Sequence, residues 1–374
     1  MGSAPEQSRL FEPLQIGKYK LQNRLIMAPL TRFRADDDHV QLPFVKEYYT
    51  QRASSPGTLL ITEATFISAK AGGYPNVPGI YNQAQIDAWK EIVESVHKAG
   101  GIIFMQLWAL GRTANPQVKE KEGTGDLVSS SAVPENSDKA EPRPLSEEEI
   151  QEYIRDYATA AKNAVEGAGF DGVEIHGANG YLIDQFTQDV CNQRTDKWGG
   201  SIENRSRFGL EVAKAVVEAV GADRTGIRLS PWSSFQGMKM QEPKPQFSHL
   251  IKGLKELNLV YLHLVESRIS GNADVESTEK NTDLINLWSP SPVLLAGGFT
   301  PDAARNDVDK LYKDKDMAIV FGRYFISNPD LVYRLKNDIE LTKYNRDTFY
   351  NPKSKDGYID YEFSEQWQKE NSKL

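Results

Sequence analysis

Short hydrophobic runs alternate with amphipathic stretches along most of the chain. The runs are rich in aliphatic and β-branched residues and nearly continuous, as expected of parallel strands that are covered on both faces. Eight segments have this character: Arg24–Leu30, Thr58–Ala64, Ile102–Trp108, Gly172–His176, Gly226–Ser230, Val260–Val265, Val293–Ala296 and Ala318–Phe321. We predict that each of them is a strand.

The stretches between these runs have helical spacing. One begins at Ser146-Glu147-Glu148-Glu149, a capping-box pattern, and ends at Gly167 and Gly169. A second helix is expected around Glu203–Val220. Because strand and helix alternate eight times, we predict an α/β fold of the (β/α)8 TIM-barrel type. An open doubly wound sheet is the alternative, although no G-x-G-x-x-G follows an early strand.

Other segments depart from this alternation. Leu10–Leu21, with Gly17 at its centre, predicts an N-terminal β-hairpin at the floor of the barrel. The Pro/Gly/Ser-rich residues 111–145 predict an ordered lid after the third strand. We expect residues 1–9 to be flexible and the aromatic segment 342–374 to pack on the barrel, so that residues 1–374 form a single domain.

Composition and charge narrow the range of possible functions and partners. Lys and Arg number 44 against 52 Asp and Glu, a net charge of −8, and the basic residues are scattered, which disfavours a nucleic-acid or anionic-membrane partner. A single cysteine, Cys191, excludes an internal disulfide framework and a four-cysteine metal site. The sequence has no secretory signal and no apolar stretch of membrane-spanning length. We therefore expect a cytoplasmic protein without membrane contact.

Glycines follow the seventh and eighth strands, at Gly297-Gly298 and at Gly322-Arg323. Active sites of barrel enzymes lie at the carboxyl ends of the strands, and phosphate groups bind in the loops after these two. Backbone N–H groups can approach an anion there, and Arg323 can add a charge-assisted contact. Two ordinary turns with an arginine paired to a carboxylate are the alternative, but the occurrence of both at the expected strands favours phosphate binding.

The fourth strand ends in a turn with several polar groups, His176-Gly177-Ala178-Asn179-Gly180-Tyr181. His176 and Asn179 could donate to one oxygen, which would polarise a carbonyl and stabilise an enolate. Tyr181 offers a phenol that could protonate a carbanion. A lone histidine at a strand end is usually structural. We interpret His39, His97, His249 and His263, which lack such neighbours, as structural or solvent-facing. No His/Asp/Glu cluster has metal-ligand spacing, so no metal is expected.

At these residues the chain resembles the Old Yellow Enzyme family. Gly172–Leu182 is similar to the family's substrate turn, and Arg194–Ser201 with Asn204-Arg205 and Arg207-Phe208 resembles its most specific signature. Further matches are Pro29-Leu30-Thr31-Arg32, Gln106-Leu107-Trp108, Arg228-Leu229-Ser230-Pro231 and Gly322–Asp330. The resemblance extends from about Leu10 to Phe363 in the family's order.

This resemblance implies a non-covalent FMN, with NADPH or NADH as reductant. Thr31 would bond the flavin's C4 carbonyl, Gln106 its pyrimidine edge, and Arg228 would lie near N1. The implied FMN-binding residues are Pro29, Leu30, Thr31, Ala64, Gln106, Arg228, Gly297, Gly298, Gly322 and Arg323. Ala64 departs from the glycine of many relatives. The implied substrate-binding residues are His176, Asn179, Tyr181, Trp108, Tyr74, Phe299 and Tyr350. We interpret Arg194, Asp196 and Arg205 as structural ion-pair residues.

The activity that the resemblance implies is reduction of the activated C=C bond of an enone or enal. In a ping-pong cycle NAD(P)H reduces FMN, flavin N5 delivers hydride to the β-carbon, and Tyr181 protonates the α-carbon. A flavin-dependent isomerase is one alternative, because alkaloid-pathway relatives with phenylalanine at the tyrosine position isomerise. The others are an alkaloid-pathway reductase and a phenol-binding flavoprotein without significant turnover. The small-molecule substrate would bind to a monomer or homodimer.

Overall fold

The chain folds into a closed barrel of parallel strands, and the computed structural model describes residues 7–271 and 273–371. Hydrogen bonding follows the order β4-β3-β15-β14-β11-β10-β9-β6, and β4 also pairs with β6, which closes the sheet. The barrel strands are β3 (Leu25–Met27), β4 (Leu59–Ile61), β6 (Ile102–Trp108), β9 (Gly172–His176), β10 (Thr225–Leu229), β11 (Tyr261–Val265), β14 (Val293–Ala296) and β15 (Met317–Phe321). The predicted TIM barrel is therefore confirmed.

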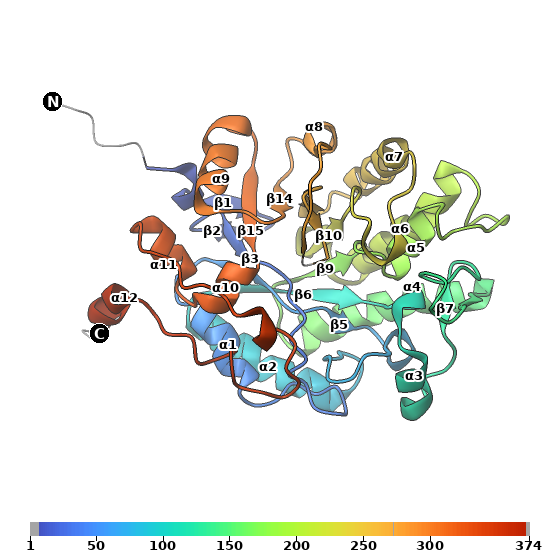
Figure 1. Cartoon of the computed structure of the whole chain (residues 1–374), viewed down its shortest axis with the longest axis horizontal. Coiled ribbons are helices and arrows are strands. Elements are labelled where there is room, and N and C mark those ends of the chain that lie inside the picture. Colours follow the sequence, from blue (N-terminus) through green and yellow to red (C-terminus); the bar gives the residue numbers. More distant parts are fainter. Residues whose placement is uncertain (1–6, 272, 372–374) are drawn as a thin grey trace.

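Helices surround the barrel (Figure 1). Those on its outside are α1 (Val45–Arg52), α2 (Gln83–Lys98), α4 (Glu147–Lys162), α6 (Ile202–Val220), α7 (Pro243–Glu256), α8 (Thr282–Trp288), α9 (Pro301–Asn306) and α11 (Leu331–Lys336). The short helices α5 (Leu182–Thr187) and α10 (Arg323–Ser327) follow β9 and β15, and α12 (Glu365–Asn371) lies near the C-terminus. No helix of the described residues is long and apolar enough to cross a membrane.

Helix α4 forms where the sequence predicts it. The Ser146 side chain accepts from the backbone N–H of Glu149 while the Glu149 side chain accepts from that of Ser146, which completes the capping box. The apolar residues at helical spacing, Ile150, Tyr153, Ile154, Tyr157, Ala161, Ala164 and Val165, are all buried. The helix continues through a π-helical turn at Asn163–Gly167, and Gly169, with φ of 84°, follows it.

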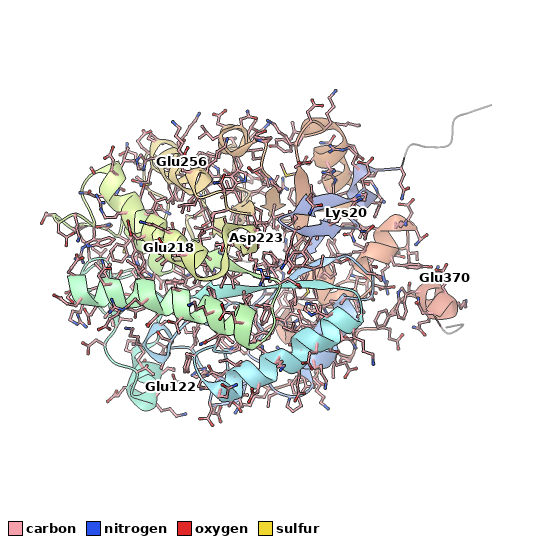
Figure 2. The ribbon with its side chains drawn as sticks, turned by 180° about the vertical axis from the view of Figure 1, so that it is seen from behind. Lys20, Glu122, Glu218, Asp223, Glu256 and Glu370 are labelled. Carbon is pink, nitrogen blue, oxygen red and sulfur yellow. The ribbon has the colours of Figure 1, made fainter. Side chains whose placement is uncertain are left out.

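The N-terminal hairpin forms the floor of the barrel. Strands β1 (Leu14–Ile16) and β2 (Tyr19–Leu21) pair antiparallel around Gly17, whose φ is 55°. A Cβ at Gly17 would lie 2.2 Å from the carbonyl oxygen of Asp223, so the hairpin contacts the connection between α6 and β10 closely. Figure 2 shows Lys20 of the hairpin near Asp223 at this end of the molecule. The predicted hairpin is confirmed.

The segment after β6 is ordered and contains its own elements. Helix α3 (Pro116–Glu122) is followed by β7 (Val128–Ser129), which pairs with β8 (Arg143–Pro144). Arg112 holds the segment in place, because its guanidinium donates to the carbonyls of Val133 and Pro134. The excursion therefore has a defined conformation.

Both chain ends contain anchored residues. Residues 1–6 of the terminus expected to be flexible lie outside the described residues. Arg9, at the end of that segment, donates its backbone N–H to Asp309. Near the other end, Arg32 donates to the carbonyls of Phe349 and Gly357, and Arg34 to those of Thr348 and Ser354. Tyr358 is fully buried. The segment around 349–358 thus packs on the barrel.

One structural interpretation of the signature segment needs correction. Arg194 pairs with Asp196 at 2.7 Å, as expected. Arg205 instead donates from Nε to the side-chain oxygen of Gln246, at 2.9 Å, and to the carbonyl of Gly200. The sequence shows the charge of Arg205, but its neutral partner Gln246 on α7 is brought to it by helix packing.

Candidate functional site

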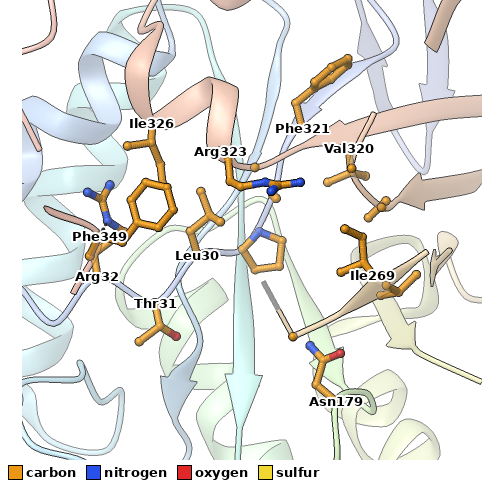
Figure 3. A pocket seen from close by; sticks show the side chains of 18 of the residues that line it. Leu30, Thr31, Arg32, Asn179, Ile269, Val320, Phe321, Arg323, Ile326 and Phe349 are labelled. Carbon is orange, nitrogen blue, oxygen red and sulfur yellow. Dashed lines mark hydrogen bonds between the residues drawn. The ribbon is translucent and has the colours of Figure 1, made fainter. Parts of the chain in front are cut away.

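A cavity of about 710 Å³ opens at the carboxyl ends of the barrel strands. Its volume lies in the range of small-molecule sites. Of the residues proposed from the sequence, it is lined by Pro29, Leu30, Thr31, Tyr74, Trp108, Asn179, Tyr181, Arg228, Gly297, Gly298, Phe299, Gly322, Arg323 and Tyr350. Figure 3 shows Thr31, Asn179 and Arg323 reaching it from different sides. The remaining three, Ala64, Gln106 and His176, are buried and are not part of its lining.

The turn after β9 presents Asn179 and Tyr181 to this cavity. Asn179 adopts a left-handed conformation with φ of 58°, which asparagine tolerates better than most residues, and Gly180 follows with φ of 79°. The backbone N–H of Asn179 donates to Ser230 Oγ at 2.7 Å, and that of Gly180 donates to Asp184 Oδ2 at 2.9 Å. Neighbouring elements therefore hold the turn.

His176 is neutral and has a defined tautomer. Its Nδ1 accepts a hydrogen bond from the backbone N–H of Ala178 at 3.3 Å, so the ring proton resides on Nε2. Burial, together with the positive charge of Arg228, lowers the pKa of His176 well below its usual value. The imidazole is nearly parallel to the Trp108 ring, with centroids 6.1 Å apart. His176 can therefore act as a fixed neutral donor.

Tyr181 lies against both of these rings. Its centroid is 4.8 Å from that of Trp108 and 4.9 Å from that of His176, in edge-to-face arrangements. Burial raises the pKa of the Tyr181 phenol well above its usual value. The phenol consequently retains its proton at neutral pH and is available as a proton donor.

A belt of polar side chains crosses the barrel just behind the cavity. Strand register places Gln106 beside Glu174, and Arg228 between His176 and His263. Gln106 Nε2 donates to Glu174 Oε1 at 2.8 Å, and His263 Nδ1 lies 2.8 Å from Glu174 Oε2. Burial acts to raise the pKa of Glu174, but the attraction of His263 and Arg228 and the hydrogen bonds outweigh it and lower that pKa. Glu174 is therefore an ionised group in the barrel interior.

His263 and Glu174 were absent from the site proposed on sequence. His263 was interpreted as structural or solvent-facing; it is fully buried and belongs to this belt. The alternation of side chains along β9 could have indicated Glu174, because it shares a face with His176. No comparable signal marks His263, since its role depends on which strand lies next to β10.

The opposite end of the cavity is formed by the paired glycines and Arg323. Gly297 has φ of 137°, and a Cβ there would lie 2.6 Å from the Cβ of Glu266, so only glycine fits without displacement. The Arg323 guanidinium lines the cavity and also makes two hydrogen bonds of 2.9 Å to the carboxylate of Asp274. The arginine–carboxylate pair weighed from the sequence is thus present, and it lies beside glycines that line the cavity.

Comparison with known proteins decides the family. A profile of the NADH:flavin oxidoreductase / NADH oxidase family matches residues 9–342. The structure of Old Yellow Enzyme from Pichia sp. AKU4542 superposes with a TM-score of 0.89 at 41% identity, covering 96% of this chain and 94% of that one. The chain belongs to the Old Yellow Enzyme family.

Curated fungal proteins of the Old Yellow Enzyme family are more similar in sequence. A chanoclavine-I aldehyde reductase of Penicillium roqueforti (strain FM164) is 60% identical over 363 residues, which cover 97% of this chain and 98% of that protein. A probable inactive reductase of Epichloe festucae var. lolii is 55% identical over 373 residues, covering 98% of each. Similar relatives therefore include both a named aldehyde reductase and a protein described as inactive.

The residues of this Old Yellow Enzyme chain fit the FMN that the family implies, used with NAD(P)H. Arg228 Nε is buried and has no hydrogen-bond partner among the described residues, so the barrel holds a cation in need of an acceptor. Gly297 and Gly298 leave the space in which a phosphate could approach the backbone. Gln106, Arg228, Thr31 and Arg323 would hold the flavin, in the roles that the resemblance implies.

Several cavity residues of this Old Yellow Enzyme chain were missed. Phe235 follows β10, Ile269 and Asp274 follow β11, and Tyr344 and Phe349 belong to the C-terminal segment. Ile269 and Asp274 belong to a hairpin of two-residue strands, β12 (Ile269–Ser270) and β13 (Ala273–Asp274), and the others to short connecting segments. Segments this short show no periodic pattern that marks the inward side. The described residues contain no group of three or more His, Cys, Asp or Glu side chains that could hold a metal ion.

Proposed function

We propose that this protein is an FMN-dependent reductase that adds two hydrogens across the activated C=C bond of an α,β-unsaturated aldehyde. The similarity to a chanoclavine-I aldehyde reductase over nearly the whole chain favours an aldehyde of an alkaloid-type secondary pathway as its substrate. NADPH or NADH would be the reductant. Simple enones and enals are the broader substrate class.

The observation that carries this proposal is that a protonated phenol lies beside two hydrogen-bond donors, one a side-chain amide and the other an imidazole. Tyr181 and Asn179 line the cavity, and the His176 ring lies 4.9 Å from that of Tyr181. An aldehyde oxygen held by His176 Nε2 and Asn179 would become more negative as the β-carbon receives hydride. The phenol of Tyr181 is then close enough to supply the proton that the α-carbon needs.

The protein's own residues would bind, orient and protonate the substrate. When bound, FMN would supply the hydride that it takes from NAD(P)H. Arg228 offers a positive charge in the cavity lining, and Glu174 fixes the amide of Gln106 by accepting a hydrogen bond from its Nε2. Trp108 and Tyr74, whose rings are 5.8 Å apart, form an apolar wall that keeps water from the reacting carbon atoms.

Tyr181 also argues against the two rival functions. An isomerase must return the hydride to its donor, and a nearby proton donor instead traps the reduced product. A flavoprotein that binds phenols without turnover has no need of a buried phenol in this position. The probable inactive relative is nevertheless similar enough that turnover has to be measured.

A comparison of the two half-reactions tests the proposal. FMN-loaded protein should be bleached by NADPH, and its colour should return on addition of chanoclavine-I aldehyde or cyclohexenone, with a product heavier by two hydrogens. Tyr181→Phe should slow recolouring by roughly a hundredfold or more, because general acid catalysis contributes at least about that factor. Flavin reduction by NADPH should be nearly unchanged.

The matched control is Tyr333→Phe, a partly exposed tyrosine of α11 outside the cavity lining. It should leave both half-reactions unchanged. A product of unchanged mass would assign isomerisation instead. Equal loss of both half-reactions in Tyr181→Phe would contradict the role of the phenol.

A further inference from the structure

The loop after β10 packs directly on the catalytic turn. A Cβ at Gly180 would lie 2.9 Å from Gln236 Cβ and 2.9 Å from Met238 Cγ, so the two loops meet without space for a side chain at Gly180. The segment Phe235–Gly237 contributes Phe235 to the cavity lining, whereas Gln236 lies just behind it. The turn that carries Asn179 and Tyr181 therefore has a fixed neighbour.

The side chain of Gln236 contacts both catalytic residues of this turn. Its Nε2 donates to the backbone carbonyl of Asn179 at 2.6 Å. The same side chain comes close enough to the phenol of Tyr181 to act on it as a donor, which lowers the pKa of the phenol. A carboxamide NH2 group has two hydrogens, so one can serve each oxygen.

Gln236 is itself held in an uncommon backbone conformation. Its φ and ψ are 58° and 38°, in the left-handed region that residues other than glycine, asparagine and aspartate rarely adopt. Its carbonyl accepts a hydrogen bond of 3.0 Å from Arg112 Nη2, and Arg112 comes from the segment after β6. A Cβ at Gly237 would lie 2.5 Å from the carbonyl oxygen of Glu135, in that same segment. Three loops thus fix where the Gln236 side chain points.

We propose that Gln236 is a positioning residue for the reduction, which holds Asn179 in place and orients the phenol of Tyr181 for proton transfer. The inference rests on the proposed function. When Tyr181 gives up its proton, the phenolate oxygen needs a donor, and the second N–H of Gln236 is in place to provide it. This hydrogen bond lowers the pKa of Tyr181, although burial raises it more.

Two substitutions of Gln236 test this inference in the FMN-loaded protein. Gln236→Met keeps the length of the side chain but removes both donors, so we expect reduction of chanoclavine-I aldehyde or cyclohexenone by the reduced flavin to slow by about tenfold or more. Bleaching by NADPH should be retained. Recolouring by benzoquinone should also be retained, because the quinone takes its protons on oxygen and needs no donor at carbon.

Gln236→Glu provides a readout that a purely structural role would not change. The carboxyl has the shape of the amide, and it can donate a hydrogen bond only while it is protonated. It would be partly buried and would face two acceptor oxygens, which raises its pKa above the ordinary value. We therefore expect alkene reduction by Gln236→Glu to be fastest at low pH, where its single O–H can donate to one of the two oxygens, and to fall as this carboxyl ionises. The wild-type rate should show no such fall over that range.

The outcomes separate the inference from the function on which it rests. Wild-type rates of alkene reduction in Gln236→Met, or a rate for Gln236→Glu that does not depend on pH, would overturn the role of Gln236. If Gln236→Met does not retain FMN, the pH profile of Gln236→Glu decides the question alone. Failure of the wild-type protein to reduce any alkene, while benzoquinone still recolours it, would instead contradict the proposed function.

Discussion

The carboxylate of Asp274 accepts hydrogen bonds from the guanidinium of Arg323, the group that the proposed phosphate site needs. Its two carboxylate oxygens each lie 2.9 Å from an Arg323 nitrogen, and the hydrogen bonds from Arg323 lower the pKa of Asp274. The carboxylate is therefore ionised at neutral pH. A phosphate bound at Arg323 would face a second negative charge on the same cation.

Substitution of Asp274 should consequently strengthen FMN binding. We expect Asp274→Asn to lower the Kd for FMN by roughly three- to tenfold, a modest effect because the partly exposed carboxylate is screened by solvent. Titration of the FMN-free protein with FMN, followed by flavin fluorescence, measures this Kd. Asp302→Asn, which removes the same charge from a fully exposed side chain, should leave it unchanged. A weaker affinity in Asp274→Asn would mean that the carboxylate orients Arg323 for the phosphate.

Among the elements, the segment between β6 and α4 depends on one buried arginine. Arg112 is 3% exposed and donates to the carbonyls of Val133, Pro134 and Gln236. It therefore connects the segment after β6 to the loop after β10. Arg143, in the same segment, makes exposed ion pairs with Asp126 and Glu149. Exposed pairs of that kind contribute little to stability.

Replacement of these two arginines should therefore have unequal effects. In Arg112→Met, the carbonyls of residues 133, 134 and 236 lose their donor, so we expect faster amide hydrogen exchange over residues 130–140 and 234–240. Alkene reduction should slow as well, because Gln236 loses a contact that fixes it. Arg143→Met should leave exchange over residues 234–240 as it is in the wild type. Similar exchange in the two variants would show that Arg112 does not connect the loops.

At the scale of the whole molecule, two buried carboxyl groups make the free energy of unfolding depend on pH. Burial raises the pKa of Glu63 to about 7, although Gln41 and Tyr49 donate hydrogen bonds to it. Burial likewise raises the pKa of Asp184 to about 7. Both groups bind a proton more tightly in the folded chain than in the unfolded chain. Their contribution to stability is complete below pH 4 and is lost as the pH rises to about 7.

Glu63→Gln should reduce this dependence on pH. The amide has the shape of the protonated carboxyl and does not ionise. The free energy of unfolding should therefore fall between pH 5 and 8 by up to roughly 3 kcal/mol less than in the wild type, because a shift of one pKa unit corresponds to about 1.4 kcal/mol. Urea unfolding at several pH values measures the free energy of unfolding directly. Glu120→Gln, at an exposed position of α3, is the control and should follow the wild type. An unfolding free energy of Glu63→Gln that falls between pH 5 and 8 as much as that of the wild type would contradict the raised pKa of Glu63.

Most of the barrel could be predicted from local sequence. The predicted bounds of Ile102–Trp108, Gly172–His176 and Val293–Ala296 agree with β6, β9 and β14. The predicted strand Thr58–Ala64 is longer than β4. The backbone N–H of Thr62 still donates to the carbonyl of Phe104 on β6, but that of Glu63 donates to the Tyr49 hydroxyl and not to a neighbouring strand. Hydrophobic runs therefore identify a strand, and the pairing partners decide where it ends.

The amino-acid sequence by itself determined the alternation of strands and helices and the turn from His176 to Tyr181, because both depend on residues that are near one another along the chain. Folding decided that Gln236 contacts this turn, that His263 pairs with Glu174, and that Asp274 pairs with Arg323. Each of these contacts joins loops or strands far apart along the chain. Closing the barrel brings their ends to one rim, and no local pattern encodes which side chains meet there.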